Sequence, residues 1–157
     1  MIKLLRIDKR LLHGQIAFNW TTFVRADCIL IACDSLQNDP LRLTTIKMSK
    51  PAGVKLVIKN IEDSIQAINS GKTDPYSLLV VVESITDAYR MIKGCPVFKQ
   101  LSIGYNAKRD NTHTLTSWVW ATDQEIELLK ELNDEGIKVE AQIVPTTNAV
   151  EFAKLIK

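Results

Sequence analysis

Short apolar runs alternate with amphipathic segments along the whole chain. Some runs are continuously apolar, such as Leu78–Val82, which indicates strands that are covered on both faces, as in a parallel sheet between helices. The expected strands are Ile2–Ile7, Cys28–Cys33, Val54–Ile58, Leu78–Val82, Leu101–Tyr105, Trp118–Trp120 and Val139–Val144. The chain is therefore predicted to form a single α/β domain over residues 1–157, with an open, mostly parallel sheet of about seven strands and helices on both faces.

Start and stop signals mark the helices between these runs. Asp39-Pro40 opens one helix, since proline is tolerated at the first helical position, and Thr122-Asp123-Gln124-Glu125 is a full capping box for another. Other caps are expected at Asn60 before Ile61–Asn69, at Ser84 before Ala88–Ile92, and at Thr147 before a last helix that contains Val150 and Phe152. The polar stretch Asn106–Thr116 predicts a surface loop or a hairpin.

Composition adds little to this pattern and excludes some partners. Hydrophobic residues make up 46% and charged residues 24%, the balance of an ordinary soluble globular protein. The net charge of +2 is too small to imply nucleic acid or an anionic membrane as a partner. We find neither an apolar stretch of about 18 residues nor a signal peptide, so we expect a cytoplasmic protein.

The three cysteines fit a reducing compartment. Cys28 and Cys33 are separated by an odd number of positions and should point to opposite faces of one strand. Their spacing matches no zinc pattern, and Cys95 lies alone in a turn. No metal site is expected.

The most informative segment is the loop after the first strand. Arg6, Asp8, Lys9, Arg10 and His13 lie within eight residues and are followed by Gly14 and a helix. In open α/β sheets, ligands bind at the carboxyl ends of the strands, and a helix N-terminus offers free N–H groups to an anion. The loop therefore combines a histidine with the surroundings that a phosphoryl group would need.

The chemistry of His13 follows from its neutral ring nitrogen, which is a competent nucleophile near physiological pH. Asp8 is placed either to fix the histidine tautomer or to orient Arg10, and the sequence does not separate these roles. Taken alone, this spacing is more typical of a solvated or structural histidine.

The motif Arg6-Ile7-Asp8-Lys9-Arg10-Leu11-Leu12-His13-Gly14-Gln15, with Trp20 a few residues on, changes this assessment. It closely resembles the signature of the IIB component of the mannose/fructose/sorbose family of the bacterial phosphoenolpyruvate-dependent sugar phosphotransferase system. The likeness continues through Asp34–Leu43, Pro51–Val54 and the segment from Gly136 to Pro145, and so covers essentially the whole chain.

The resemblance implies a phosphotransferase that needs no cofactor or metal. His13 would accept a phosphoryl group from a phosphohistidine of a IIA domain and pass it to a sugar taken up through membrane IIC and IID components. Asp8 and Arg10 would complete the catalytic group, while Arg6, Lys9, Gly14 and Gln15 would bind phosphate or a docking partner. The protein would associate peripherally with the membrane transporter. The sequence leaves open which sugar is carried and whether copies form a homo-oligomer.

Three positions depart from the family pattern. Lys9 replaces a second acidic residue, which makes the loop more basic, and Tyr105 and Asn106 replace the residues usual after Gly104. We expect these positions to affect partner or sugar specificity. His113 is expected to be a solvated surface residue.

Two rival functions belong to other classes. A receiver-like signalling domain would be phosphorylated on Asp8, although Lys9 stands where such chemistry wants a second acid. A non-catalytic anion- or nucleotide-binding module is the other, but the chain lacks the Walker pattern and G-x-G-x-x-G after its first strand.

Overall fold

The computed structural model describes residues 1–156. Its strands are β1 Ile2–Ile7, β2 Cys28–Ala32, β3 Lys55–Lys59, β4 Leu78–Val82, β5 Gln100–Ile103, β6 Thr112–Thr116, β7 Val119–Thr122, β8 Lys138–Ala141 and β9 Val150–Glu151. Its helices are α1 Gly14–Val24, α2 Pro40–Met48, α3 Ile61–Asn69, α4 Ile85–Gly94, α5 Asp123–Asp134 and α6 Phe152–Leu155, with a 3₁₀ turn, η1, at Ser35–Asn38. From β1 to β5, the alternation of strands and helices is the predicted one.

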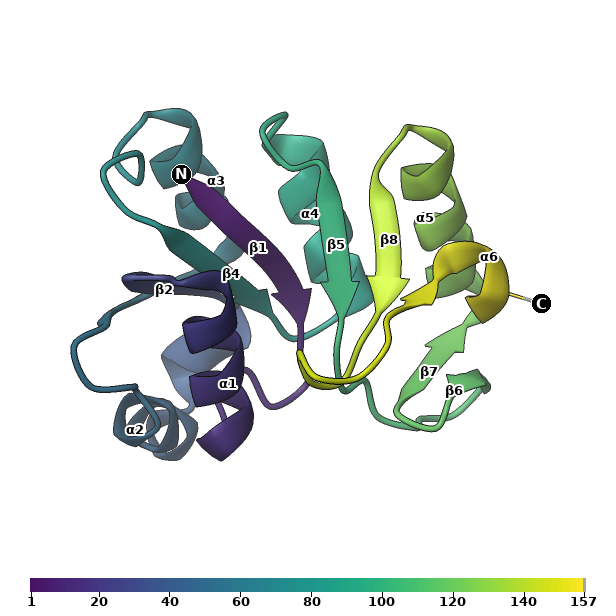
Figure 1. Cartoon of the computed structure of the whole chain (residues 1–157), viewed down its shortest axis with the longest axis horizontal. Helices are drawn as coiled ribbons and strands as arrows, with labels where there is room; N and C mark the ends of the chain where they lie inside the picture. Colours follow the sequence, from purple (N-terminus) through teal and green to yellow (C-terminus); the bar gives the residue numbers. More distant parts are fainter. Residues whose placement is uncertain (157) are drawn as a thin grey trace.

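The main sheet has the strand order β3-β2-β4-β1-β5-β8-β9, and only the β8–β9 pairing is antiparallel. The predicted open and mostly parallel α/β sheet is confirmed. β1 is the central strand, and the arrowheads of β1, β5 and β8 end at the same edge of the sheet (Figure 1). Loops after these strands therefore meet at one edge.

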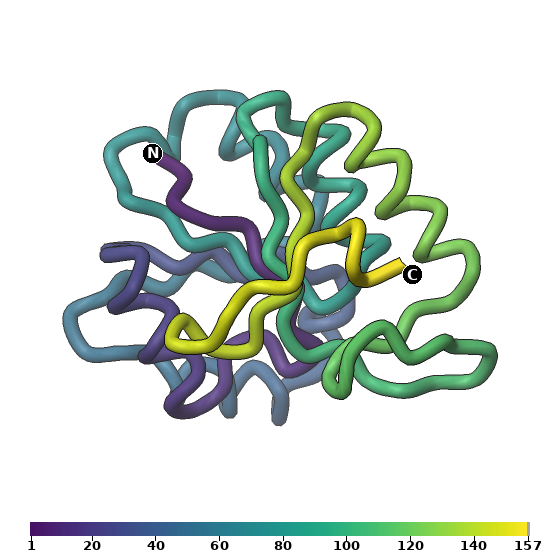
Figure 2. Tube along the Cα trace, turned by 45° about the vertical axis from the view of Figure 1, so that its right-hand side comes forward, coloured from purple at the N-terminus to yellow at the C-terminus, as the bar shows by residue number. Residues whose placement is uncertain are grey.

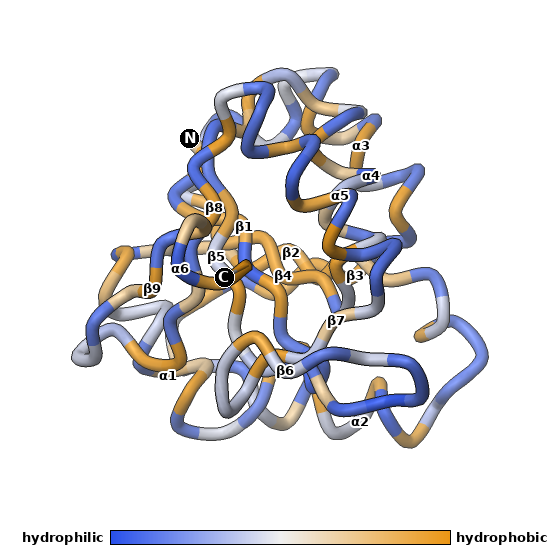
Figure 3. The backbone as a smooth tube through the Cα atoms, turned by 90° about the vertical axis from the view of Figure 1, so that its right-hand side faces the viewer, coloured by the Kyte–Doolittle hydropathy of each residue, from blue (hydrophilic) through white to orange (hydrophobic). Residues whose placement is uncertain are grey.

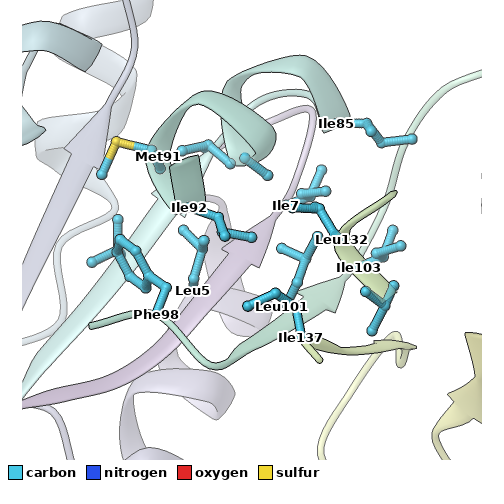
Figure 4. Close-up of a cluster of buried hydrophobic side chains, with 14 of the residues drawn as sticks. Leu5, Ile7, Ile85, Met91, Ile92, Phe98, Leu101, Ile103, Leu132 and Ile137 are labelled. Atoms are coloured by element: carbon cyan, nitrogen blue, oxygen red, sulfur yellow. The ribbon is translucent and has the colours of Figure 1, made fainter. Parts of the chain in front are cut away.

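Helices cover both faces, and each face has its own apolar core. One core is formed by β-strand residues with α3, α4 and α5, and Figure 4 shows Leu5 and Ile7 of β1 packed near Met91 and Ile92 of α4. The other core lies under α1 and α2. Cys28 belongs to the first core and Cys33 to the second, as predicted from their spacing. The hydrophobic strands accordingly run through the middle of the molecule (Figure 3).

The helix starts confirm most of the predicted caps. The side chains of Asp39, Asn60 and Ser84 each accept a backbone N–H at the start of α2, α3 and α4. At α5 the Thr122 hydroxyl accepts from Glu125 N, and the Glu125 carboxylate accepts from Thr122 N, which completes the capping box.

Two predictions about the C-terminal half are wrong. Trp118–Trp120 does not join the main sheet, because β7 pairs with β6 in a separate antiparallel hairpin. Thr147 does not cap the last helix: Val150–Glu151 forms β9, and α6 begins only at Phe152. Val150 pairs with Ala141, so pairing with the sheet edge prevails over a helical pattern that is short and weak.

The segment between β8 and β9 runs beside α1 (Figure 2). The Trp20 indole N–H on α1 donates to the carbonyl of Ile143 at 3.2 Å. This contact brings the C-terminal segment close to the helix that follows the His13 loop.

Candidate functional site

The loop between β1 and α1 is fixed by both neighbouring strands. Asp8 N donates to Val82 O at the end of β4, at 2.9 Å, and Lys9 N donates to Tyr105 O just after β5, at 2.8 Å. Leu11 N then donates to Asp8 O at 2.8 Å and closes a tight turn. The start of the loop is therefore held between the ends of β4 and β5.

Two buried leucines decide which side chains of this loop face solvent. Leu11 and Leu12 are 4% and 2% exposed and belong to the core under α1 and α2. Leu11 adopts a φ of 60°, a left-handed conformation that costs a non-glycine residue roughly 1–2 kcal/mol. With both leucines anchored inward, Lys9, Arg10 and His13 are left exposed.

His13 is the N-cap residue of α1. Its backbone is extended (φ −147°, ψ 109°), its carbonyl accepts from Ala17 N at 3.2 Å, and its side chain makes no capping hydrogen bond. Gly14 follows with a φ of 48°, and the first turn of α1 contains no acidic residue. Within residues 1–156 the imidazole has no hydrogen-bond partner, and His13 stands at the positive end of an eleven-residue helix.

Asp8 orients Arg10. Its carboxylate Oδ1 accepts from the Arg10 backbone N at 2.9 Å and lies 3.7 Å from Arg10 Nε. Burial raises the pKa of Asp8, and the bonds to Arg10 and the charges of Arg10, Arg6 and His13 oppose that rise. Within residues 1–156, the polar side-chain contacts of Asp8 are with Arg10, so the geometry favours the Arg10 role over a tautomer-fixing bond to His13.

Tyr105 is the member of this group that the sequence-based site omitted. The Arg10 guanidinium carbon lies 4.7 Å from the centre of the Tyr105 ring, within the range of a cation–π contact. The sequence marked Tyr105 only as a departure from the family pattern. Its contact with Arg10 depends on the pairing of β1 with β5, which the sequence does not specify.

Arg6 does not join the exposed group. It is 2% exposed, and its guanidinium donates to Ser102 Oγ at 2.9 Å and to the carbonyls of Gln142 and Ile143 at 2.8 Å each. The guanidinium carbon of Arg6 also lies 4.1 Å from the centre of the Trp20 ring. Burial lowers its pKa to about 10, so it stays protonated at neutral pH. These contacts give Arg6 a structural position beneath the loop.

Lys9 and Gln15 lie at the exposed rim of the group. The Lys9 side chain is exposed, while its carbonyl accepts from Arg42 Nη2 at 3.2 Å. Gln15 donates to Asn19 one turn along α1 at 3.3 Å. Both side chains are accessible to a partner.

A second charged group supports the loop from α2. Arg42 donates to Glu83 Oε2 at 2.8 Å and to Ser35 Oγ at 3.3 Å, in addition to Lys9 O. Burial would raise the pKa of Glu83, but the hydrogen bond and charge of Arg42, with smaller contributions from Cys33 and Lys9, lower it below its usual value. Glu83 follows β4 directly, so this group also depends on strand order, and the sequence analysis did not predict the contact between Arg42 and Glu83.

The remaining candidate residues lie apart from this group. His113 is exposed on β6, and its Nε2 lies 2.7 Å from Asp123 Oδ1. Trp118 is half-buried and packs against the larger core. Among residues 1–156, no three His, Cys, Asp or Glu side chains are grouped as a metal site would need. No helix in that range is long and apolar enough to cross a membrane.

Comparison with known proteins shows a match along the whole chain. The family model described as the PTS system sorbose subfamily IIB component matches residues 2–157. A probable phosphotransferase enzyme IIB component of Streptococcus pyogenes serotype M6 is 28% identical, with 99% of each chain covered. The mannose-specific EIIAB component of Escherichia coli K12 is also 28% identical, over 99% of this chain and 48% of that one.

The fold has a solved counterpart. The crystal structure of the IIBSor domain of the sorbose permease from Klebsiella pneumoniae superimposes with a TM-score of 0.93 at 27% identity, covering 99% of this chain and 96% of that one. The strand order and layers described above are therefore those of a known phosphotransferase domain.

Proposed function

The chain belongs to the sorbose-subfamily IIB components of the PTS system, and from that premise we propose that His13 carries the phosphoryl group. Membership makes the protein a phosphotransferase component. The proposal adds the residue, the phosphohistidine intermediate and the order of transfer.

Transfer onto His13 exchanges one phosphorus–nitrogen bond for another. A ring nitrogen of neutral His13, which we assign as Nδ1, attacks the phosphorus of a donor phosphohistidine, and the bond to the donor nitrogen breaks. In the second step a sugar hydroxyl attacks the same phosphorus. The bond to His13 breaks, and the hydroxyl proton passes to the ring nitrogen that the phosphoryl group leaves, which regenerates neutral His13 as the sugar phosphate forms.

The observation that carries the proposal is the exposed His13 at the start of α1, three residues after an arginine that a buried carboxylate contacts. Developing negative charge on the phosphoryl oxygens can be stabilised by the free N–H groups of the first turn and by Arg10. Arg10 binds oxygens in a planar fork, and Asp8 restricts where that fork points.

The names of the relatives indicate the partners. A protein of Escherichia coli is named an EIIAB component, and other relatives are named for fructose, sorbose and N-acetylgalactosamine. We propose that a IIA domain is the donor and that transfer to sugar takes place at membrane IIC and IID components, on the cytoplasmic side. The exposed rim formed by Lys9 and Gln15 is accessible for docking.

The test is phosphorylation of the purified protein by a phosphorylated IIA domain. The expected label is acid-labile and alkali-stable, and it is absent in His13→Ala. Because the His13 side chain makes no capping bond, this variant should keep α1 intact. His113→Ala is the matched control, since it removes the only other histidine, and it should be labelled as the wild type is. Absence of transfer to the wild-type protein would refute the proposal and favour an anion-binding module.

Phosphorylation on Asp8 is the distinguishable rival. An acyl phosphate would be lost in alkali, and Asp8→Asn would abolish it while His13→Ala would not. Asp8 is 3% exposed and its Oδ1 contacts Arg10, so a donor would have to displace the loop to reach it. The geometry therefore supports His13.

A further inference from the structure

Tyr105 contacts the His13 loop through both its backbone and its ring. Its carbonyl accepts from Lys9 N at 2.8 Å, and its ring centre lies 4.7 Å from the Arg10 guanidinium carbon. The guanidinium is thus held by the Asp8 carboxylate and by an aromatic face. We propose that Tyr105 is a positioning residue that holds Arg10 ready for the phosphoryl group. This inference rests on the function proposed for His13.

The backbone on both sides of Tyr105 is fixed. Gly104 N donates to Ile7 O at 2.7 Å, and a Cβ at Gly104 would lie 2.5 Å from Arg6 Nη2, so only glycine fits there. On the other side, Asn106 is 2% exposed, and its N–H donates to Trp118 O at 3.0 Å. The ring of Tyr105 therefore projects from a rigid support rather than from a free loop.

Asn106 connects this support to the β6–β7 hairpin. Its carbonyl accepts from Trp120 N at 3.1 Å, and its Nδ2 donates to Trp120 O at 3.0 Å. Two of the three residues that depart from the family pattern therefore form one unit: Asn106 fixes the segment to the hairpin, and Tyr105 carries that constraint to Arg10. The hairpin supports the site without contributing a group that touches phosphate.

Arg10 needs such a support because its side chain is long and 39% exposed. Asp8 contacts its backbone N, at the start of the residue, and its Nε, at the base of the guanidinium. Within residues 1–156, the two terminal nitrogens of Arg10 make no hydrogen bond, so they remain available to phosphoryl oxygens. The Tyr105 face restricts their orientation without occupying these donors.

The test compares single-turnover phosphoryl transfer from a phosphorylated IIA domain to Tyr105 variants. Tyr105→Leu keeps apolar bulk but removes the aromatic face, and it should lower the maximal transfer rate about five-fold. Tyr105→Phe keeps the aromatic face and should transfer at the wild-type rate. The matched control is Tyr76→Leu, since the Tyr76 ring lies 4.8 Å from Lys55 Nζ, far along the chain from the loop, and this variant should transfer at the wild-type rate.

A double-mutant cycle separates positioning from a general structural role. In an Arg10→Ala background, Tyr105→Leu should change the rate by less than about two-fold, because the group it positions is gone. A full five-fold loss in that background, or a wild-type rate for Tyr105→Leu alone, would overturn the inference. If the wild-type protein is not labelled on His13 at all, the proposed function fails first, and this inference fails with it.

Discussion

The buried guanidinium of Arg6 offers the sharpest test of how this fold supports its site. Arg6→Met removes the donors to Ser102 Oγ and to the carbonyls of Gln142 and Ile143 while keeping an unbranched apolar side chain. The sequence placed Arg6 among the phosphate-binding residues, whereas the structure gives it contacts that fasten the segment after β8 to β1 and β5. The two assignments predict different results.

The expected loss of stability follows from the contacts. Loss of the charged donor should cost roughly 1–1.5 kcal/mol of stability at each of the three acceptors, and loss of the stacking over Trp20 should cost roughly 1 kcal/mol more. The variant no longer buries a charged group, and it buries an apolar methionine side chain instead. Together these two gains offset roughly 1–2 kcal/mol of the loss. Arg6→Met should therefore lower the free energy of unfolding by about 3 kcal/mol, a large share of the total for a domain of this size.

The assay is urea unfolding of the wild-type and variant proteins, with the slope of the transition checked for each. Arg90→Met is the matched control, because Arg90 is 43% exposed and makes surface ion pairs, which contribute less than about 1 kcal/mol. If Arg6→Met were as stable as the wild type but unable to accept phosphate, the structural assignment of Arg6 would be refuted.

Three further predictions follow from the same contacts. Burial raises the pKa of Asp8, so its contribution to stability is fully present below its ordinary pKa of 3.8 and is lost as pH rises through the folded value. In urea unfolding, the wild type should therefore be favoured over Asp8→Asn more at pH 3.5 than at pH 7. An equal difference in free energy of unfolding at the two pH values would contradict this prediction. Gly104→Ala places a methyl group 2.7 Å from Ile7 O and should lower the free energy of unfolding by roughly 1–3 kcal/mol; a wild-type unfolding midpoint would show that the strand ends can separate. Thr122→Ala removes the capping box that Thr122 forms with Glu125 at the start of α5, and it should lower the free energy of unfolding, measured by thermal unfolding, by about 1 kcal/mol. Labelling of His13 should be unchanged in this variant.

The sequence was sufficient for the elements whose signals are local. Asn60 caps α3 and Thr122 caps α5 because each reaches a backbone N–H only three residues away. The continuously apolar run Leu78–Val82 is a strand buried on both faces for the same kind of local reason. Where the local signal is weak, as at Val150–Glu151, pairing with a distant strand decided the structure.

In the candidate site, too, some features follow from local sequence and others from tertiary packing. The position of His13 at the end of a strand and the start of a helix can be inferred from the loop itself, since strand, turn and helix are contiguous. The inward side chains of Leu11 and Leu12, which leave His13 exposed, depend on a core that forms only when α1 packs on the sheet. The contiguous motif therefore singled out the histidine through its resemblance to a family signature, but it did not determine which of the charged neighbours share the surface of His13.

By itself, the sequence determined the fold class, the central loop and the candidate phosphate carrier, because these depend on contiguous patterns. Only the tertiary structure separated Arg6 from Arg10. Arg6, at the end of β1, and Arg10, four residues later in the loop, have opposite environments: the first is buried against Gln142 and the second is exposed against Tyr105. The reason is that strand order, a long-range property, brings β5 and the segment after β8 beside β1, and these neighbours decide which charge is buried and which remains exposed.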